Sequence, residues 1–243
     1  MLSRTFRIGT RNSPLALKQV EEVLDYLKRF YPQMKVEIIG IDTYGDKDKI
    51  IPISNIEGTD FFTREIDEAL LRGDIDFAVH SAKDLPDQIP VGLVIAAITE
   101  SIDPYDALVS KNNLKIGELG VRAKIGVSSE RRKTQLKEYR TDFQIIDIRG
   151  NVEVRLEKLD KSRPFYCEGK MQSKKGRDKD GLDAIIVASC ALLRLGLEDR
   201  IAQRIPFEIL RPHPLQGSLA IEVRDNDKKI INLFSKLDMR KEI

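Results

Sequence analysis

Short apolar runs alternate along the chain with longer segments in which apolar residues recur at helical spacing. The short runs are rich in Ile, Val and Phe and predict strands at residues 5–9, 35–41, 75–79, 93–98, 106–109, 124–127, 144–147, 184–188 and 219–223. The longer segments predict helices at residues 14–30, 61–72, 130–139, 151–160, 190–195 and 228–237. This alternation is typical of an α/β protein with mostly parallel sheets.

The pattern also predicts two domains. Turn residues in the segment Glu100–Pro104 separate two strand-like runs, and strand–helix units begin again after it, so we place a boundary near residue 100. Two stretches lack any apolar period. Residues 161–181 are charged and contain glycine, which predicts an exposed insertion, and residues 46–60 predict a loop.

Polar and cationic residues follow four of the predicted strands, at the point where each strand ends. In open parallel sheets, ligands bind beyond the carboxyl ends of the strands, where the N-termini of the following helices also point. We therefore expect one cleft between the two domains. Guanidinium groups pair bidentately with carboxylates and phosphates, so the cleft should bind an anion with several such groups. The cations expected to line it are Arg11, Lys83, Arg131, Arg132, Arg149 and Arg155.

A more ordinary interpretation exists for each of these charges. An arginine near a strand end is commonly a surface charge or part of a structural ion pair, and Lys83 with Asp84 could be an exposed pair at a turn. The recurrence at four strand ends favours the binding site. Asp84 also follows a strand that is apolar on both faces, which is typical of a central strand.

Composition narrows the function classes. The chain has 243 residues, and its 41 Lys+Arg against 39 Asp+Glu leave a net charge of +2, which argues against a general nucleic-acid binder. The N-terminus runs directly into the first strand, and no apolar segment is as long as a membrane span, so we expect a cytoplasmic protein. Cys167 and Cys190 form no CxxC pair, which agrees with a reducing compartment.

Familiar catalytic motifs are missing from the sequence. His80 and His213 have no second ligand at metal-like spacing, so no metal site is predicted. The sequence contains neither GxGxxG nor GxxxxGK[ST], which leaves dinucleotide and P-loop binding unsupported. It contains no GxSxG turn either.

Five ordered segments resemble the signature segments of the porphobilinogen deaminase (hydroxymethylbilane synthase) family. They are IGTRNSPLALKQ (8–19), HSAKDLP (80–86), GVSSERRKTQL (126–136), DIRGNVEVRLEKL (147–159) and LDAIIVASCALLRLGL (182–197). The resemblance implies two domains of the periplasmic-binding-protein type that face each other across a cleft. Domain 1 would comprise residues 1–99 and 200–223, domain 2 residues 100–199, and residues 224–243 a helical tail.

The resemblance also implies an activity and its residues. Members of this family join four porphobilinogen molecules head to tail, losing one ammonia per step, on the route to haem. Asp84 and Lys83 would be the catalytic residues, and Phe62 would lie on an active-site loop. The residues expected to bind substrate and cofactor are Arg11, Ser13, Ser81, Ser129, Arg131, Arg132, Arg149, Gly150, Asn151 and Arg155. We expect a monomer with neither nucleic-acid nor membrane partners. The alternative is a non-catalytic cytoplasmic module that binds a polycarboxylate or a tetrapyrrole precursor.

The expected cofactor is a dipyrromethane, which this family attaches through a thioether to a cysteine of a small third domain. After residue 223 the sequence shows a charged helical tail and no evident anchor, so we expect the third domain to be missing or supplied by a separate polypeptide. Cys190 is expected to be a packing residue. Cys167 is a weak candidate for a substitute anchor, because an irregular exposed insertion would position a cofactor poorly.

Overall fold

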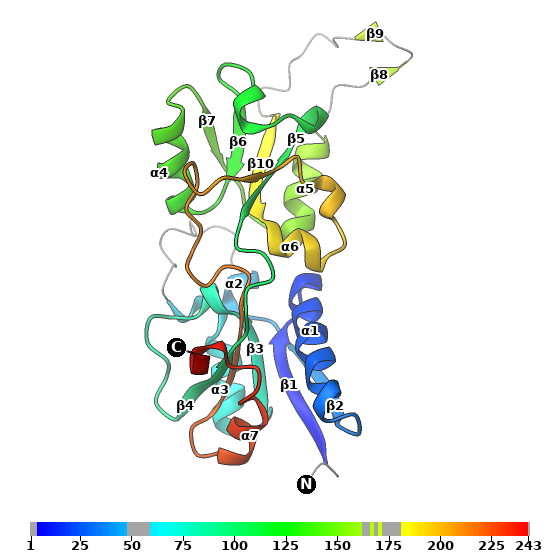
Figure 1. Ribbon diagram of the computed structural model, residues 1–243, viewed down its shortest axis with the longest axis vertical. Helices are drawn as coiled ribbons and strands as arrows, with labels where there is room; N and C mark the ends of the chain where they lie inside the picture. The colour runs from blue at the N-terminus through cyan, green and yellow to red at the C-terminus, as the bar shows by residue number, and fades with distance from the viewer. Residues whose placement is uncertain (1–3, 48–58, 162–165, 168–169, 172–180, 243) are drawn as a thin grey trace. The chain divides into compact units, whose positions relative to one another are not determined.

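The computed structural model describes residues 4–47, 59–161, 166–167, 170–171 and 181–242. It divides into two compact units: unit 1 is Met1–Pro104 with His213–Ile243, and unit 2 is Tyr105–Pro212 (Figure 1). Residues 200–212 were predicted to belong to domain 1 but lie in unit 2. The reason is strand pairing, because β11 (Gln203–Ile205) is antiparallel to β5 (Asp106–Ser110).

Unit 1 contains a five-stranded sheet in the order β2-β1-β3-β12-β4, with β3 at its centre. β1 is parallel to both of its neighbours, whereas β12 is antiparallel to β3 and to β4. The strands are β1 (Thr5–Arg11), β2 (Lys35–Ile41), β3 (Phe77–Ser81), β4 (Leu93–Ile98) and β12 (Leu219–Arg224). The central position predicted for the strand before Asp84 is confirmed.

Helices cover both faces of this sheet. α1 (Pro14–Phe30) buries Val20 and Leu27 in a core that also contains Phe77 and Phe234. α3 (Arg64–Arg72) packs on the opposite face, where Ala78 is buried. The remaining helical segments are α2 (Tyr44–Lys47), α7 (Lys228–Leu233), η2 (Asp60–Phe62), η3 (Ala82–Asp84) and η7 (Met239–Glu242).

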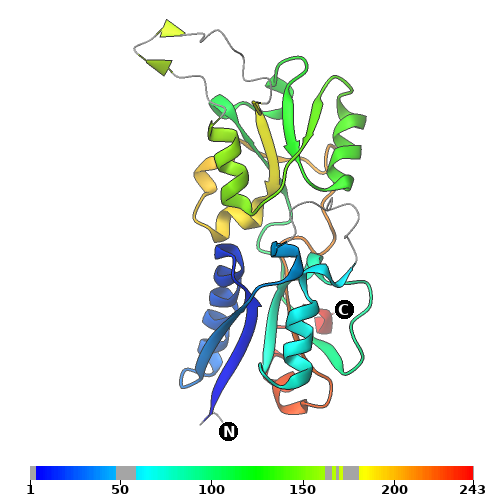
Figure 2. The same ribbon diagram turned by 180° about the vertical axis from the view of Figure 1, so that it is seen from behind.

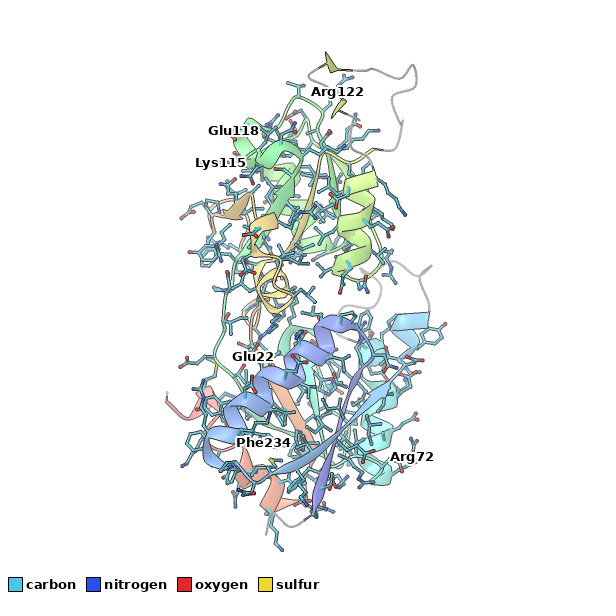
Figure 3. All side chains as sticks on the ribbon, turned by 90° about the vertical axis from the view of Figure 1, so that its right-hand side faces the viewer. Glu22, Arg72, Lys115, Glu118, Arg122 and Phe234 are labelled. Carbon is cyan, nitrogen blue, oxygen red and sulfur yellow. The ribbon has the colours of Figure 1, made fainter. Side chains whose placement is uncertain are left out.

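The segment predicted as a helical tail is part of the unit 1 core. α7 ends at Leu233, and the next residue, Phe234, is fully buried with its ring centroid 4.8 Å from that of Phe77 (Figure 3). Ile230 and Leu237 are buried in the same core. The α7 segment therefore stabilises the sheet that carries β3.

Unit 2 contains a second five-stranded sheet, in the order β11-β5-β10-β6-β7. β6 is parallel to β7 and β10, while β5 is antiparallel to β10 and β11. α5 and α6 lie beside β10 (Figures 1 and 2). The elements not yet bounded are β6 (Lys124–Val127), β7 (Gln144–Asp147), β10 (Ala184–Ala188), α4 (Glu130–Tyr139), α5 (Val152–Lys161), α6 (Ser189–Arg194), η4 (Lys111–Asn113), η5 (Ile116–Glu118), η6 (Glu198–Arg200), β8 (Tyr166–Cys167) and β9 (Lys170–Met171).

Each predicted strand and helix has an observed counterpart. Both sheets are mixed, however, so the prediction of mostly parallel sheets overstated the share of parallel pairings. In each sheet one internal strand, β12 or β5, runs antiparallel to both neighbours. Most of the predicted insertion 161–181 and of the predicted loop 46–60 lies outside the described residues. Among the helices that are described, none combines the length and the apolarity needed to cross a membrane.

Candidate functional site

The predicted site residues of unit 1 lie at one edge of its sheet. β1 and β3 are parallel neighbours in the register Gly9↔Ala78, so their carboxyl ends lie at the same edge. Arg11 is the last residue of β1, and Ser81 is the last residue of β3. The short helix η3 follows Ser81 immediately and contains both Lys83 and Asp84.

Neighbouring elements hold this turn from several sides. Gln19 on α1 donates a hydrogen bond to Ser81 Oγ (2.7 Å), and the backbone N–H of Ala82 donates to the Ser218 carbonyl (3.0 Å). The Lys83 ammonium donates to the side-chain oxygen of the buried Gln216 (3.2 Å). These contacts fix the backbone from which the half-buried Asp84 projects.

The Asp84 carboxylate makes no ion pair or hydrogen bond to another described residue. Asp76, directly before β3, differs in this, because it pairs with Arg7. A half-buried carboxylate without a partner among the described residues can accept hydrogen bonds from a ligand. This is the property that the predicted catalytic role of Asp84 requires.

Two further predicted residues of unit 1 have identifiable contacts. The Arg11 guanidinium lies over the ring of Phe62 in η2, 4.6 Å from its centroid, which is within cation–π range. Ser13 caps α1, because its Oγ accepts a hydrogen bond from the Ala16 N–H (3.2 Å). Phe62 therefore orients the charge at the end of β1, and Ser13 has a structural role whether or not it also binds a ligand.

In unit 2, Arg131 and Arg132 share one buried carboxylate. Asp106, at the start of β5, is fully buried, with Oδ2 3.0 Å from Arg131 Nη2 and Oδ1 2.6 Å from Arg132 Nη2. The Arg132 side chain is 6% exposed and that of Arg131 is 27% exposed. Of the two guanidinium groups on this carboxylate, that of Arg131 is the one that reaches solvent. Ser129 precedes both arginines as the N-cap residue of α4.

The other predicted residues of unit 2 follow β7, the parallel neighbour of β6. Gly150 has φ +112°, and a Cβ placed there would lie 2.6 Å from a methyl group of Val154, so only glycine fits. Asn151 Oδ1 accepts a hydrogen bond from the Val154 N–H (3.0 Å), and Arg155 Nε donates to the Gly150 carbonyl (2.8 Å). This tight turn holds Arg149 and Arg155 at the same edge of the sheet as Ser129.

The structure thus gathers the predicted residues into two sets, one at a sheet edge of each unit. Their convergence on a single cleft stays a prediction. Sequence reasoning missed Asp106 and Gln216, whose contacts hold predicted site residues. Asp106 begins a strand instead of following one, and Gln216 lies far along the chain from Lys83, so neither could be found from strand ends.

Sequence reasoning also missed the surroundings of His80. The buried side chains of Asp67, His80 and Glu222 bring their ligand atoms within 4.8 Å of one another, an arrangement that could hold a cation. His80 Nε2 lies 3.1 Å from Glu222 Oε2. Burial and the charge of Glu222 raise the pKa of the Asp67 carboxyl to about 7. The three residues come from α3, β3 and β12, so no spacing in the sequence indicates the cluster.

A sequence model of the family described as "Porphobilinogen deaminase, dipyromethane cofactor binding domain" matches residues 6–232. The chain belongs to the porphobilinogen deaminase family. The porphobilinogen deaminase of Natranaerobius thermophilus is 43% identical over 232 residues, which cover 96% of this chain and 69% of the relative. That of Syntrophomonas wolfei is 41% identical over 235 residues, which cover 97% of this chain and 71% of the relative.

Solved structures confirm the predicted fold of the periplasmic-binding-protein type. A putative methionine-binding lipoprotein from Bacillus subtilis has a TM-score of 0.50 at 11% identity, covering 96% of this chain and 89% of the lipoprotein. The sulfate-bound OxyR2 regulatory domain from Vibrio vulnificus has a TM-score of 0.50 at 12% identity, covering 97% of this chain and 93% of that domain. At these identities the likeness extends to the fold alone.

The residues of the chain fit part of what the dipyrromethane cofactor of this family needs. The cofactor carries carboxylates, and Arg131, Arg149 and Arg155 provide guanidinium groups at one sheet edge of unit 2. The cofactor of this family also needs a cysteine thiol for its thioether bond. Cys190 lies in the first turn of α6 and is 4% exposed, so its thiol is packed and does not fit. The side chain of Cys167 lies outside the described residues.

Proposed function

We propose that this protein joins four porphobilinogen molecules head to tail, with loss of one ammonia per molecule, to form hydroxymethylbilane for haem biosynthesis. The observation that carries the proposal is the family match over residues 6–232, which includes all of the candidate site residues. The position of Asp84 at the end of the central strand supports it independently.

Binding would depend on the arginines. Each porphobilinogen carries an acetate and a propionate, so the growing chain is a polycarboxylate that gains charge at every step. Guanidinium groups bind carboxylates bidentately, and several sites are needed to hold several rings. Arg131, Arg149 and Arg155 in unit 2 and Arg11 in unit 1 would supply them. When bound, the dipyrromethane supplies the free pyrrole carbon to which the first substrate is joined.

The chemical step would depend on Asp84. The carbon–nitrogen bond of the aminomethyl group breaks, ammonia leaves, and the remaining methylene carbon becomes electrophilic with a positive charge spread over the pyrrole. A pyrrole carbon of the growing chain attacks, a carbon–carbon bond forms, and the attacked carbon loses its proton. A carboxylate that accepts hydrogen bonds from the pyrrole N–H groups stabilises this positive charge, and its acid form can protonate the leaving amine.

Lys83 would act as a binding residue beside Asp84. Its ammonium donates to the side-chain oxygen of Gln216 (3.2 Å), which holds the positive charge next to Asp84, where a substrate carboxylate could pair with it. Lys83 and Arg11 would therefore bind carboxylates, while Asp84 stabilises the positively charged pyrrole ring.

The proposal is tested by incubating the purified protein with porphobilinogen, oxidising the product and measuring uroporphyrin by its absorbance. The wild-type protein should form uroporphyrin, and Asp84→Asn should lower the rate by roughly 10²- to 10⁴-fold, the usual contribution of a group that transfers or stabilises a proton. Asp87→Asn is the matched control, because Asp87 is an exposed acid three residues later and should keep full activity.

Three results would count against the proposal or a part of it. Absence of uroporphyrin from the folded wild-type protein would remove the catalytic function. Full activity of Asp84→Asn would leave the family assignment standing but would exclude Asp84 as the catalytic group. Binding of porphobilinogen without turnover by the wild-type protein would favour the alternative, a module that captures a tetrapyrrole precursor.

A further inference from the structure

Asp67, His80 and Glu222 form a buried cluster between α3 and the sheet of unit 1. Their exposed fractions are 3%, 6% and 1%. His80 is paired opposite Ala220 in the β3–β12 ladder, so Glu222, two residues farther along β12, lies diagonally from it on the same face. The His80 Nε2 atom is 3.1 Å from Glu222 Oε2, which makes this an imidazole–carboxylate hydrogen bond.

The cluster lies directly before the proposed catalytic turn. His80 is the penultimate residue of β3, and η3 with Asp84 begins two residues later. Phe77 and Val79 face the core on the α1 side, while Ala78 packs on the α3 side, so His80 faces α3 as well. The hydrogen bond to Glu222 therefore fixes the end of β3 on one face.

Charge explains why the cluster must bind a proton. With all three groups ionised, two carboxylates and one imidazolium would leave a net negative charge on buried side chains, which is costly. Thr63 Oγ1 donates to Asp67 Oδ2 (3.0 Å), whereas Asp67 Oδ1 is buried and has no hydrogen-bond partner among the described residues. Burial and the charge of Glu222 raise the pKa of Asp67 to about 7, so the cluster keeps a proton near neutral pH.

The charges on the surrounding elements are already engaged elsewhere. α3 packs against β1, β3, β4, β12 and η2. On β1, Arg7 pairs with Asp76, and on β12, Arg224 donates to the carbonyls of Leu70 and Ile75. Arg11 on β1 lies over the ring of Phe62, and Asp60 on η2 pairs with Arg64 of α3. On α3 itself, Glu65 accepts a hydrogen bond from the Tyr44 N–H, and Glu68 pairs with Arg72. β4 carries no ionisable side chain. The charged groups that act on Asp67 are thus Glu222 and His80.

We propose that His80 is a positioning residue for Asp84, and that Asp67 and Glu222 hold it by sharing one proton. The inference rests on the proposed function, because it assigns His80 a task in the same reaction. His80 does not reach the substrate. It keeps the end of β3 in place, and a displacement of a catalytic group by about 1 Å can lower a rate by up to about 100-fold.

The first test separates positioning from binding. His80→Ala should lower kcat about 10- to 100-fold and leave KM within about twofold, since the carboxylate-binding arginines are untouched. His80→Gln should recover much of the loss, because its amide nitrogen can donate to Glu222 as Nε2 does. A purely structural role would lower the amount of folded protein without this split. Equal kcat in His80→Ala and the wild type would overturn the inference.

The second test compares how kcat depends on pH in the wild type and in Asp67→Asn. It tests the inference even if His80→Ala does not fold. Above about pH 7 Asp67 ionises, the shared proton is lost, and a second negative charge faces Glu222. In Asp67→Asn the amide can donate to Glu222 at every pH. The ratio of the wild-type kcat to that of Asp67→Asn should therefore fall from pH 6 to pH 8. Glu68→Gln, an exposed change on the same helix, should follow the wild type.

The outcomes distinguish this inference from the proposed function. A pH-independent ratio in an active protein would overturn the inference alone. An inactive wild-type protein would overturn the proposed function and, with it, the inference. One equivalent of zinc or manganese in the purified wild-type protein that is lost in Asp67→Asn would show that the cluster holds a metal ion in place of the shared proton, which also overturns it.

Discussion

Substitution of Asp106 should destabilise unit 2 more than any change at an exposed ion pair. Asp106 is fully buried and contacts Arg131 at 3.0 Å and Arg132 at 2.6 Å. Arg131 is 27% exposed and can be hydrated once the carboxylate is gone, but Arg132, at 6%, cannot. Leaving one charge buried without its partner costs about 3–5 kcal/mol, so we expect a loss of this size in Asp106→Ala. Asp106→Asn keeps an acceptor and should lose less.

The assay is urea unfolding followed by circular dichroism, with the free energy of unfolding extrapolated to water. Glu157→Ala is the matched control, because Glu157 pairs with Lys161 (2.6 Å) in the same unit and the two side chains are 57% and 73% exposed. Its loss should be much smaller, since water replaces the partner of an exposed charge. Equal unfolding free energies for Asp106→Ala and Glu157→Ala would refute the reasoning. A second readout is binding of porphobilinogen, which should weaken in Asp106→Asn because Arg131 is no longer oriented.

Three further predictions concern stability and use the same unfolding assay. The pKa of the Asp67 carboxyl is raised from an ordinary 3.8 to about 7, so the folded state holds this proton more tightly than the unfolded state does. The free energy of unfolding that this proton contributes is present below pH 3.8 and is lost as the pH rises to about 7. The wild type should thus lose up to about 4 kcal/mol relative to Asp67→Asn across this range, whereas a wild type that tracks the variant at every pH would contradict the cause given. Gly150→Ala should cost about 1–3 kcal/mol because of its positive φ and the nearby Val154 methyl, while Gly120→Ala, with open space around it, should cost little; equal losses would show that the turn adapts. Phe234→Ala should cost about 3–5 kcal/mol, because its fully buried ring packs on Phe77, and a loss below 1 kcal/mol would show that the α7 segment is dispensable for the core.

The parts of the site that follow strands could be predicted from the sequence. Arg11, Ser81 and Arg149 each lie at the end of a strand or within two residues of it, and an apolar run followed by polar residues marks such a position clearly. Parallel pairing then brings neighbouring strand ends to one edge. This reasoning needs only local pattern and a rule of sheet topology.

The residues that hold the site in place could not be predicted in this way. Glu222 lies 142 residues from His80, and Asp106 lies 25 residues from Arg131, so neither contact leaves a periodic signal. β11 was not predicted because three residues are too few to show an alternation of apolar and polar positions. The antiparallel direction of β12 was missed for a related reason: an apolar run predicts a buried strand but says nothing about which way it runs.

The most direct test of the central claim is the ammonia released per porphobilinogen consumed, measured together with the mass of the pyrrole product. The account predicts one ammonia for each porphobilinogen and a linear product of four pyrrole rings from the wild-type protein. Asp84→Asn should bind porphobilinogen and release almost no ammonia. Binding by the wild-type protein without ammonia release would contradict the claim and identify the chain as a binding module.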